Sequence, residues 1–217
     1  NIYDANGKII LQAEINKEAK REQEMSKSDY ISLSFRADKF VLLPAGSYIE
    51  YTYYIDEVRT VTRNFLLLNP YEPTQKNEIT WEYSLEFHHP KMALGKIPFY
   101  INTKNSQNKP VKNTSWDFVG TVYGIMDKAC DFLNNDIKFG NCGWTANVSE
   151  NIKNSITVSF SDVDFLAGLS SIANAVGNEC EWHIDYDDEI IYIGKVVIGS
   201  PNVTLKVGEN VSVANVS

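Results

Sequence analysis

"SITVSFSDVDFLAGLSSIANAVGNECEWHIDYDDEIIYIG", residues 155–194, is the stretch that decides the fold. Its first six residues alternate polar and apolar side chains, and the apolar ones are Ile156, Val158 and Phe160. A period of two is typical of a strand with one buried face. The stretch therefore begins with a strand that faces a core.

A helix is expected directly after this strand. Ser161, with Asp164 three residues later, resembles a helix start of the capping-box kind, and Gly177 stands where a left-handed C-cap would end the helix. Between them, apolar residues recur at helical spacing: Phe165, Leu166, Leu169, Ile172, Ala173 and Val176. Such a stripe needs a sheet to pack on.

The residues after the helix predict that sheet. Apolar residues alternate with polar ones at Cys180, Trp182 and Ile184, and Asp187-Asp188 can turn the chain into a second strand at 190–193. We expect a small α+β domain over residues 115–198, with two helices packed on a sheet. Its first helix is expected to be capped by Thr114 or Ser115 and to carry one apolar face, formed by Val119, Val122, Met126, Ala129 and Leu133. A strand near 137–144 is expected to follow this helix.

Residues 1–101 are dominated by strand signals, so we expect a β-rich, tube-like domain there. The dipeptide Asn6-Gly7 favours a tight hairpin turn. The fold class predicted for the whole chain is α+β and mainly β: an antiparallel barrel-like or sandwich domain followed by the α+β domain. Strands are expected at 2–3, 9–15, 30–35, 48–54, 58–68 and 79–87.

Three segments connect or flank these domains. Residues 17–27 are dense in charge, which is typical of a solvated excursion, with a binding arm as the alternative. Residues 102–114 are polar and aperiodic, so we expect a linker. In 199–217, apolar residues again alternate, which indicates a strand that returns to the first domain or leads into a further C-terminal part.

Composition narrows the classes of partner. The chain has 217 residues and a formal charge of −8, from 28 acidic and 20 basic residues. This charge disfavours a nucleic-acid partner, because phosphate binding needs a positive surface. No apolar run reaches the roughly 18–20 residues that cross a bilayer, so we expect no membrane insertion.

The histidines are weak candidates for chemistry. Adjacent residues of a strand point to opposite faces, so His88 and His89 cannot both bind one metal ion without a bulge. A structural role is therefore favoured for this pair over metal ligation. His183 is expected on the polar face of its hairpin strand, at the surface.

The acidic cluster has two interpretations. Asp185, Asp187, Asp188 and Glu189 could suggest a calcium loop, but they lack its twelve-residue spacing and central glycine. A hairpin turn explains them better.

The other reactive side chains predict no site. Cys130, Cys142 and Cys180 are odd in number and lack metal-type spacing, which favours buried free thiols. We expect no catalytic residue, no cofactor-binding residue and no metal ligand, and a protein that is not an enzyme. An active site formed by carboxylates from distant positions in the sequence stays open as an alternative.

Tyrosines gather in one predicted strand, at Tyr48, Tyr51, Tyr53 and Tyr54. Alternating tyrosines on a strand form half-buried sheet surface, and they are also what a protein or glycan interface would use.

Several stretches together carry a resemblance to a known family. They are IYDANGKII, SDYISLSF, LPAGSYIEY and EYSLEFHHPKMALGKIPF in the first half, and ITVSFSDVDFLAGLSSIANAVGNECEWHID followed by EIIYIG in the second. In this order they resemble the N-terminal region of bacteriophage and prophage tail hub proteins, the baseplate hub and tail-associated family. The resemblance rests on hydrophobic and turn patterns and covers nearly the whole chain.

The resemblance implies a structural virion protein. It would form a homo-oligomeric ring, typically a trimer, that continues the tail tube and anchors tip proteins. Its partners would be other tail proteins, and it would be assembled in the bacterial cytoplasm and carried in the virion. The strands at 30–35 and 79–87 would be sheet and interface material.

Two other functions stay open. One is a carbohydrate- or protein-binding β module of a surface adhesin, with the tyrosine-rich strand as its recognition face. The other is a hydrolase whose site is assembled from scattered acidic residues.

Overall fold

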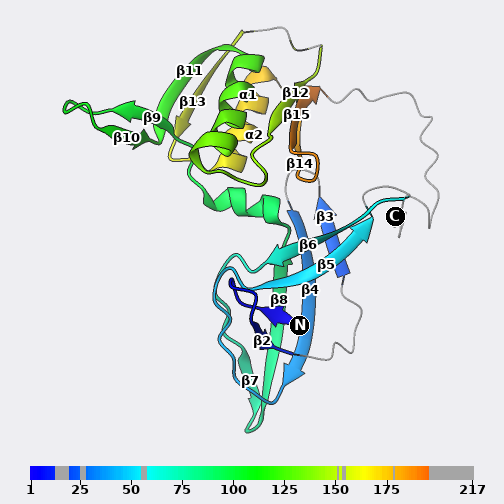
Figure 1. Ribbon diagram of the computed structural model, residues 1–217. Coiled ribbons are helices and arrows are strands. Elements are labelled where there is room, and N and C mark those ends of the chain that lie inside the picture. Colours follow the sequence, from blue (N-terminus) through cyan, green and yellow to red (C-terminus); the bar gives the residue numbers. More distant parts are fainter. Residues whose placement is uncertain are drawn as a thin grey trace.

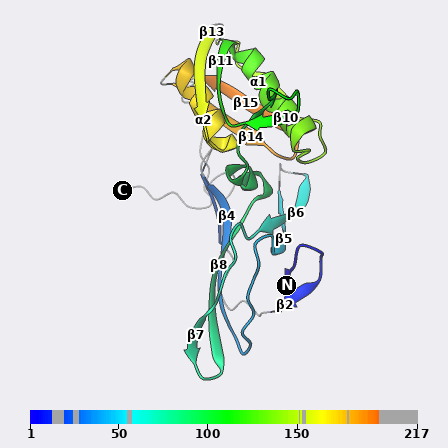
Figure 2. The ribbon, with the colours of Figure 1, turned by 90° about the vertical axis from the view of Figure 1, so that its left-hand side faces the viewer.

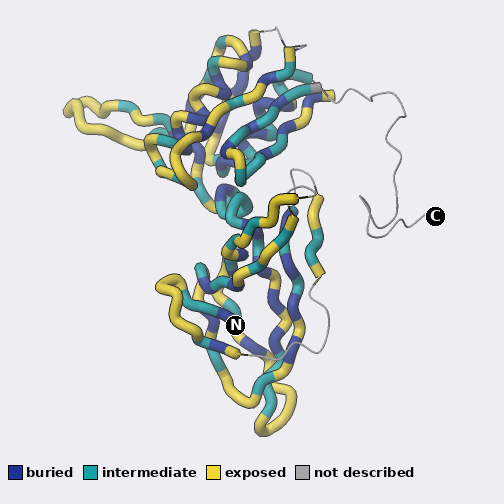
Figure 3. The backbone as a smooth tube through the Cα atoms, turned by 45° about the vertical axis from the view of Figure 1, so that its right-hand side comes forward, coloured by how far each residue is buried: buried dark blue, intermediate teal, exposed yellow. Residues whose placement is uncertain are grey.

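The structure is a computed structural model that describes residues 1–12, 20–24, 28–54, 58–150, 152, 155–177 and 179–195. Two separate clusters of buried apolar side chains divide the described chain, one formed by residues up to Phe87 and the other by residues from Leu94 on (Figure 3). We call these parts unit 1 and unit 2. The charged segment at 17–27, predicted to be a solvated excursion, forms a strand of the unit 1 sheet over its described part, Lys20–Glu24, while residues 17–19, 25–27 and 199–217 lie outside the described residues.

Unit 1 is a single sheet of eight strands. The pairing order is β2-β1-β5-β6-β8-β4-β3, with β7 paired to β8, and all its pairs are antiparallel. The strands are β1 (Ile2–Tyr3), β2 (Ile9–Leu11), β3 (Lys20–Glu24), β4 (Ser28–Ala37), β5 (Tyr48–Tyr54), β6 (Thr60–Leu66), β7 (Thr74–Asn77) and β8 (Thr80–His88).

The hairpin predicted at Asn6-Gly7 is confirmed. β1 and β2 pair, and the Asp4 carboxylate accepts hydrogen bonds from the backbone N–H groups of Asn6 and Lys8, both at 2.9 Å. Gly7 has φ +84°, a left-handed conformation that glycine adopts without strain. The turn is therefore specified by an aspartate before it as well as by the Asn-Gly dipeptide.

The core of unit 1 follows the period of two. Ile31, Leu33 and Phe35 of β4 are buried, and they lie opposite the buried residues Phe87, Leu85 and Tyr83 of β8. The β5–β6 hairpin crosses this long ribbon near the junction with unit 2 (Figures 1 and 2). The predicted mainly β, antiparallel α+β class is confirmed. No strand pairing closes the sheet into a barrel among the described residues.

Unit 2 combines two small sheets with two helices. β11 (Ser115–Thr121) pairs with β13 (Ser155–Ser161), while β15 (Ile190–Lys195) pairs antiparallel with β14 (Cys180–Asp185) and parallel with β12 (Thr145–Val148). The helices are α1 (Val122–Asp131), extended by a π-helical turn at Phe132–Asp136, and α2 (Phe165–Val176). A 3-10 helix, η1 (Pro90–Lys96), leads in from unit 1.

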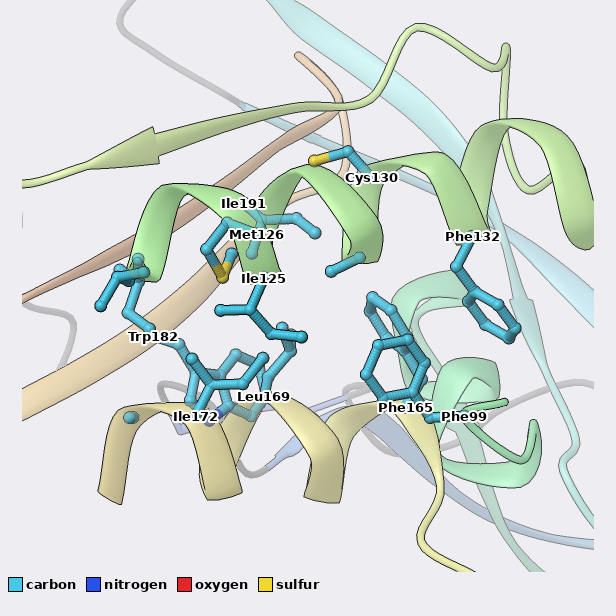
Figure 4. Close-up of a cluster of buried hydrophobic side chains, with 14 of the residues drawn as sticks. Phe99, Ile125, Met126, Cys130, Phe132, Phe165, Leu169, Ile172, Trp182 and Ile191 are labelled. Carbon is cyan, nitrogen blue, oxygen red and sulfur yellow. The ribbon is translucent and has the colours of Figure 1, made fainter. Parts of the chain in front are cut away.

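The two helices pack against each other through apolar side chains, as Figure 4 shows. The Phe99 ring is 1% exposed and lies 5.2–5.3 Å, between ring centroids, from four other rings: Trp116, Phe132, Phe160 and Phe165. Edge-to-face contacts of this kind favour a fixed ring position. Phe99 is therefore the centre of the unit 2 core.

The structure corrects the start of both helices. Helix α1 begins at Val122, because Thr121 is its N-cap and accepts a hydrogen bond from the Gly124 N–H at 3.2 Å. Val119 belongs to β11 and is 75% exposed, so it is not on the buried helix face. Helix α2 is capped by Asp164, which accepts from the Ala167 N–H at 2.9 Å, whereas Ser161 ends β13. The strand expected at 137–144 begins only at Thr145.

The segment at 102–114, which we expected to be a linker, contains a hairpin instead. β9 (Ile101–Lys104) pairs with β10 (Pro110–Asn113). The Asn105 side chain holds the turn by accepting from the N–H groups of Gln107 and Lys109, both at 3.0 Å. The hairpin has no hydrophobic period because residues 104–112 are exposed on both faces, so its sequence looks like a linker.

We expect Gly168→Ala to destabilise the protein. In most helix interiors this change adds stability, but an added Cβ here would lie 2.7 Å from Cδ1 of Phe99. Because Phe99 is enclosed by four rings, overpacking should lower the free energy of unfolding by about 1–3 kcal/mol. Urea unfolding measures the change. Asn174→Ala, at an exposed position of the same helix, is the control, and an equal response of both variants would contradict this packing.

Candidate functional site

A polar cleft lies where unit 1 and unit 2 meet. It has a volume of about 210 Å³ and receives side chains from β3, β4, β5, η1 and the β14–β15 hairpin. Its lining is Arg21, Gln23, Asp29, Tyr53, Tyr54, His89, Lys91, His183, Ile184, Asp185, Tyr186 and Asp187. This concentration of charged and aromatic groups makes it the candidate functional site.

Asp29 is the most deeply buried charged group of the site. Its side chain is fully buried, and its two carboxylate oxygens accept hydrogen bonds from Nε and Nη2 of Arg21, each at 2.9 Å. Lys91 Nζ lies 3.1 Å from Asp29 Oδ2. Burial by itself would raise the pKa of Asp29, but the Arg21 hydrogen bonds and the charges of Lys91 and Arg21 outweigh it and lower the pKa. The carboxylate is therefore ionised at neutral pH.

Arg21 also binds aromatic rings. Its Cζ atom lies 4.2 Å from the centroid of the Tyr53 ring and 5.3 Å from that of Phe65. A guanidinium over a ring face is attracted by the ring quadrupole, and more strongly when water is excluded. Arg21 thus joins β3 to β4 through Asp29 and to β5 through Tyr53.

A chain of hydrogen bonds runs from unit 1 into unit 2. His89 Nε2 lies 3.0 Å from the Tyr53 hydroxyl, which donates to Asp187 Oδ2 at 3.0 Å. Asp187 Oδ1 also pairs with Arg63, at 2.7 Å from Nε and 2.6 Å from Nη2. Asp187 belongs to the β14–β15 turn, so unit 2 contributes the acceptor and unit 1 contributes the donors.

The neutral form of His89 fits this chain. Its side chain is 2% exposed, and Nδ1 accepts from the Lys91 backbone N–H at 3.3 Å, which leaves the proton on Nε2 to donate to Tyr53. Burial, with the nearby cations Lys91 and Arg21, lowers the pKa of His89 to about 4. Burial and the Asp187 carboxylate raise the pKa of Tyr53. Both groups are therefore neutral at pH 7.

Tyr186 packs between the two units. Its ring centroid lies 5.2 Å from that of His89 in unit 1 and 5.7 Å from that of Phe139 in unit 2. The Arg63 guanidinium lies 5.7 Å from the same ring. Large amphipathic aromatics are typical anchors of an interface. The β14–β15 turn therefore docks on unit 1 through one ring and one carboxylate.

The arrangement favours rigid attachment over chemistry. The buried carboxylate is neutralised by two cations, the buried imidazole is neutral, and the tyrosine hydroxyl is hydrogen-bonded on both sides. Among the described residues, no group of three or more His, Cys, Asp or Glu side chains is placed to hold a metal ion. The geometry fixes how unit 2 sits on unit 1.

His88 and His89 have different surroundings, as the sequence predicted, but His183 is more buried than expected. The His88 ring packs on Tyr30 with centroids 5.7 Å apart, while His89 enters the junction. His183 is half-buried, stacks on Tyr192 at 5.2 Å and lines the cleft, so it is not a simple surface residue.

The acidic cluster forms the predicted hairpin turn. The Asp185 carboxylate closes the turn by accepting from the N–H groups of Asp187 and Asp188, both at 3.1 Å. Glu189 is 6% exposed and accepts from the backbone N–H groups of Asn141 and Gly143. Each carboxylate except that of Asp188 thus has a defined structural partner.

The tyrosine-rich strand β5 is mostly turned inward. Tyr51 and Tyr53 pack on Phe65 with centroids 5.5 and 6.3 Å apart, and Tyr48 stacks on Tyr3 at 5.1 Å. Only Tyr54 of the four is strongly exposed, at 74%. This arrangement forms half-buried sheet surface and offers no broad tyrosine platform.

The cysteines match the sequence prediction in part. Cys130, Cys142 and Cys180 are all free, and Cys130 and Cys180 are buried, but Cys142 is exposed.

Sequence reasoning missed the cations and the buried carboxylate of the junction. Arg21, Arg63 and Lys91 carry no local motif, because their partners lie far away in the chain. Asp29 did carry a signal. It lies two residues before Ile31 in a strand of period two, which places it on the core face, and a charge at such a position requires a partner.

In the part of the chain that the structure describes, no helix is long and apolar enough to span a membrane.

Comparisons with known proteins leave the family open. No family model matches the chain, and no curated protein matches it. Among solved structures, the crystal structure of prophage tail protein gp18 from Listeria monocytogenes EGD-e is similar, with a TM-score of 0.45 and 8% sequence identity. The match covers 89% of this chain and 49% of that chain, so this chain spans about half the length of that protein.

We expect Asp29→Asn to be strongly destabilising. The change removes the charge that compensates Arg21 and Lys91, and breaking a buried ion pair on one side costs about 3–5 kcal/mol. The matched control is Glu82→Gln, because Glu82 also bridges an arginine and a lysine but is 39% exposed. Denaturant unfolding should show a large loss for Asp29→Asn and little change for the control. Similar losses would contradict the role assigned to Asp29.

Acid should weaken the protein through His89. Its pKa is 6.5 when unfolded and about 4 when folded, so the unfolded chain binds the proton more tightly. Its contribution is complete above pH 6.5 and is lost as the pH falls from 6.5 to 4, up to about 3 kcal/mol.

Urea unfolding at pH 7.0, 5.5 and 4.5 tests this, with His89→Gln as the comparison. The variant should have a lower stability at pH 7 but a shallower decline, since His88 and His183 titrate in both proteins. An identical decline in both would show that His89 is not the group responsible.

Proposed function

We propose that the chain is a structural component of a phage or prophage tail. In this proposal it belongs to the tail tip or baseplate hub, where three copies form a ring that continues the tail tube and anchors tip proteins. Its partners are further copies of itself and neighbouring tail proteins, and its place is the virion. The proposal starts from the family resemblance of the sequence.

The observation that carries it is the unequal pair of sheet edges in unit 1. In the pairing order of the described strands, β2 and β3 are the two ends, and β7, which pairs with β8 beside this path, is polar throughout (TQKN). β3 reads KREQE, and its Lys20 and Glu22 form a surface ion pair at 3.0 Å. β2 reads IIL and carries no charge. Charged edge strands resist pairing with other chains, whereas an apolar edge invites it.

The surroundings of β2 support pairing with a neighbour. A groove of about 380 Å³ runs between residues 9–12 and the end of β4 with the loop that follows it. Ile9 is 42% exposed, and Ile10 and Val41 also line the groove. Exposed apolar side chains beside an uncharged edge strand are typical of an interaction surface. A strand or loop of the next copy would cover them in a ring.

The rigid junction also fits a ring component. A closed ring requires every copy to present its two contact surfaces at the same angle, because heterologous contacts close only at one rotation. The buried Asp29 ion pairs and the Tyr53–Asp187 link fix unit 2 on unit 1. This rigidity supports a structural role better than a flexible binding role.

Oligomer mass tests the proposal. Light scattering over a concentration series, followed by negative-stain imaging, should show rings of three copies for the chain. Ile9→Lys should shift the equilibrium toward the monomer, since it places an ammonium group at the apolar edge without disturbing a buried side chain.

The control is Ile79→Lys, the same replacement at a 74% exposed residue between β7 and β8. It should leave the mass unchanged. A chain that stays monomeric at all concentrations would contradict ring formation, and equal masses for the two variants would contradict a role of β2.

A further inference from the structure

The β9–β10 hairpin projects from unit 2, away from the helices and from unit 1 (Figure 1). All nine residues from 104 to 112 are exposed. The arm is nevertheless ordered by four cross-strand pairs and by the Asn105 side chain at its turn. An ordered arm loses little conformational entropy when it binds, so its exposed groups are pre-organised for a partner.

The charge of this arm is opposite to that of the rest of the chain. Residues 102–113 contain Lys104, Lys109 and Lys112 and no acidic residue, whereas the chain as a whole has a formal charge of −8. Among the described residues, Lys104 and Lys109 have no carboxylate at ion-pair distance. Their charges are therefore available to a partner.

The pairing register gathers the basic groups. Lys104 pairs with Pro110, and Lys112 pairs with Asn102, which lies two residues before Lys104 in the same strand. Because residues two apart in a strand point to the same face, both lysines are on one face of the hairpin. Lys112 Nζ lies 4.5 Å from the centroid of the Tyr100 ring, which holds that end of the face against the body of unit 2. Lys104 and Lys109 are farther out along the arm.

We propose that this hairpin is a basic docking arm that binds an acidic surface on a second copy of the chain. This inference rests on the proposed ring, because a projecting arm on one copy and an acidic face on the next form the heterologous contact that a ring repeats. The negative charge of the chain supplies the complementary surface. A nucleic acid is a poorer partner, because three lysines on an acidic protein cannot offset repulsion of the phosphates.

Charge reversal at the arm tests the contact. K104E/K109E should weaken self-association at least about tenfold in dissociation constant, measured by analytical ultracentrifugation in 50 mM salt. Lys112 is left unchanged because it packs over Tyr100. The matched control is K96E/K138E, which makes the same change of charge at two exposed lysines that lie outside the arm and outside the groove beside β2, and should alter the constant much less. High salt should weaken the wild-type association, since screening shortens the range of these charges.

A second measurement identifies the partner directly. A carbodiimide that joins lysine to carboxylate, applied to an equal mixture of nitrogen-14 and nitrogen-15 protein, should give mixed-isotope cross-links from Lys104 or Lys109 to an Asp or Glu. Their absence in a self-associating wild type would overturn the docking arm, as would equal association of the two double variants, and the ring proposal would stand.

A wild type that is monomeric and gives no mixed-isotope cross-links would overturn both the arm and the ring. A fluorescent single-stranded DNA added to the monomer completes the test, because binding that K104E/K109E abolishes would assign the arm to nucleic acid.

Discussion

The buried Asp29 carboxylate is the interaction on which the junction between the two units depends. A charge removed from water is tolerated only where opposite charges and hydrogen bonds replace the solvent. Asp29 obtains them from Arg21 on the neighbouring strand and from Lys91 in the helix that leads to unit 2. The same requirement therefore orders β3 against β4 and holds η1 against the sheet. Since Arg21 also lies over Tyr53, the ion pairs position the hydroxyl that binds Asp187.

The sequence was most informative where one physical period governs a whole element. The strand at 155–161, helix α2 and the β14–β15 hairpin follow from alternation, helical spacing and turn residues, and the structure places their apolar residues in one core. It was least informative at boundaries. The face at Val119 continues the apolar spacing of α1, but Thr121 caps the helix two residues later. A cap is decided by one side chain and one N–H group, which a periodic pattern does not register.

The junction could not be read from sequence for a different reason. Its members come from residues 21, 29, 53, 63, 89, 91 and 187, and no local spacing joins them. Only Asp29 and His89 show an anomaly, each being polar in a context that predicts burial or strand pairing. The β9–β10 hairpin was missed because its sequence lacks the signal of a strand. Both of its faces are exposed, so no apolar residues alternate along it, and the ordered hairpin has the polar composition of a flexible linker.

The β14–β15 turn has a mechanical consequence. In the described chain, unit 1 and unit 2 are joined covalently at the short passage around His89 and Pro90, and a single such joint would allow the units to swivel about it. The turn adds a second attachment almost a hundred residues later, through Tyr186 and Asp187. Two attachment points define an axis and resist rotation in every other direction. A twisting load on one unit would therefore pass to the other through the contacts of Tyr186 and Asp187 as well as through the covalent chain.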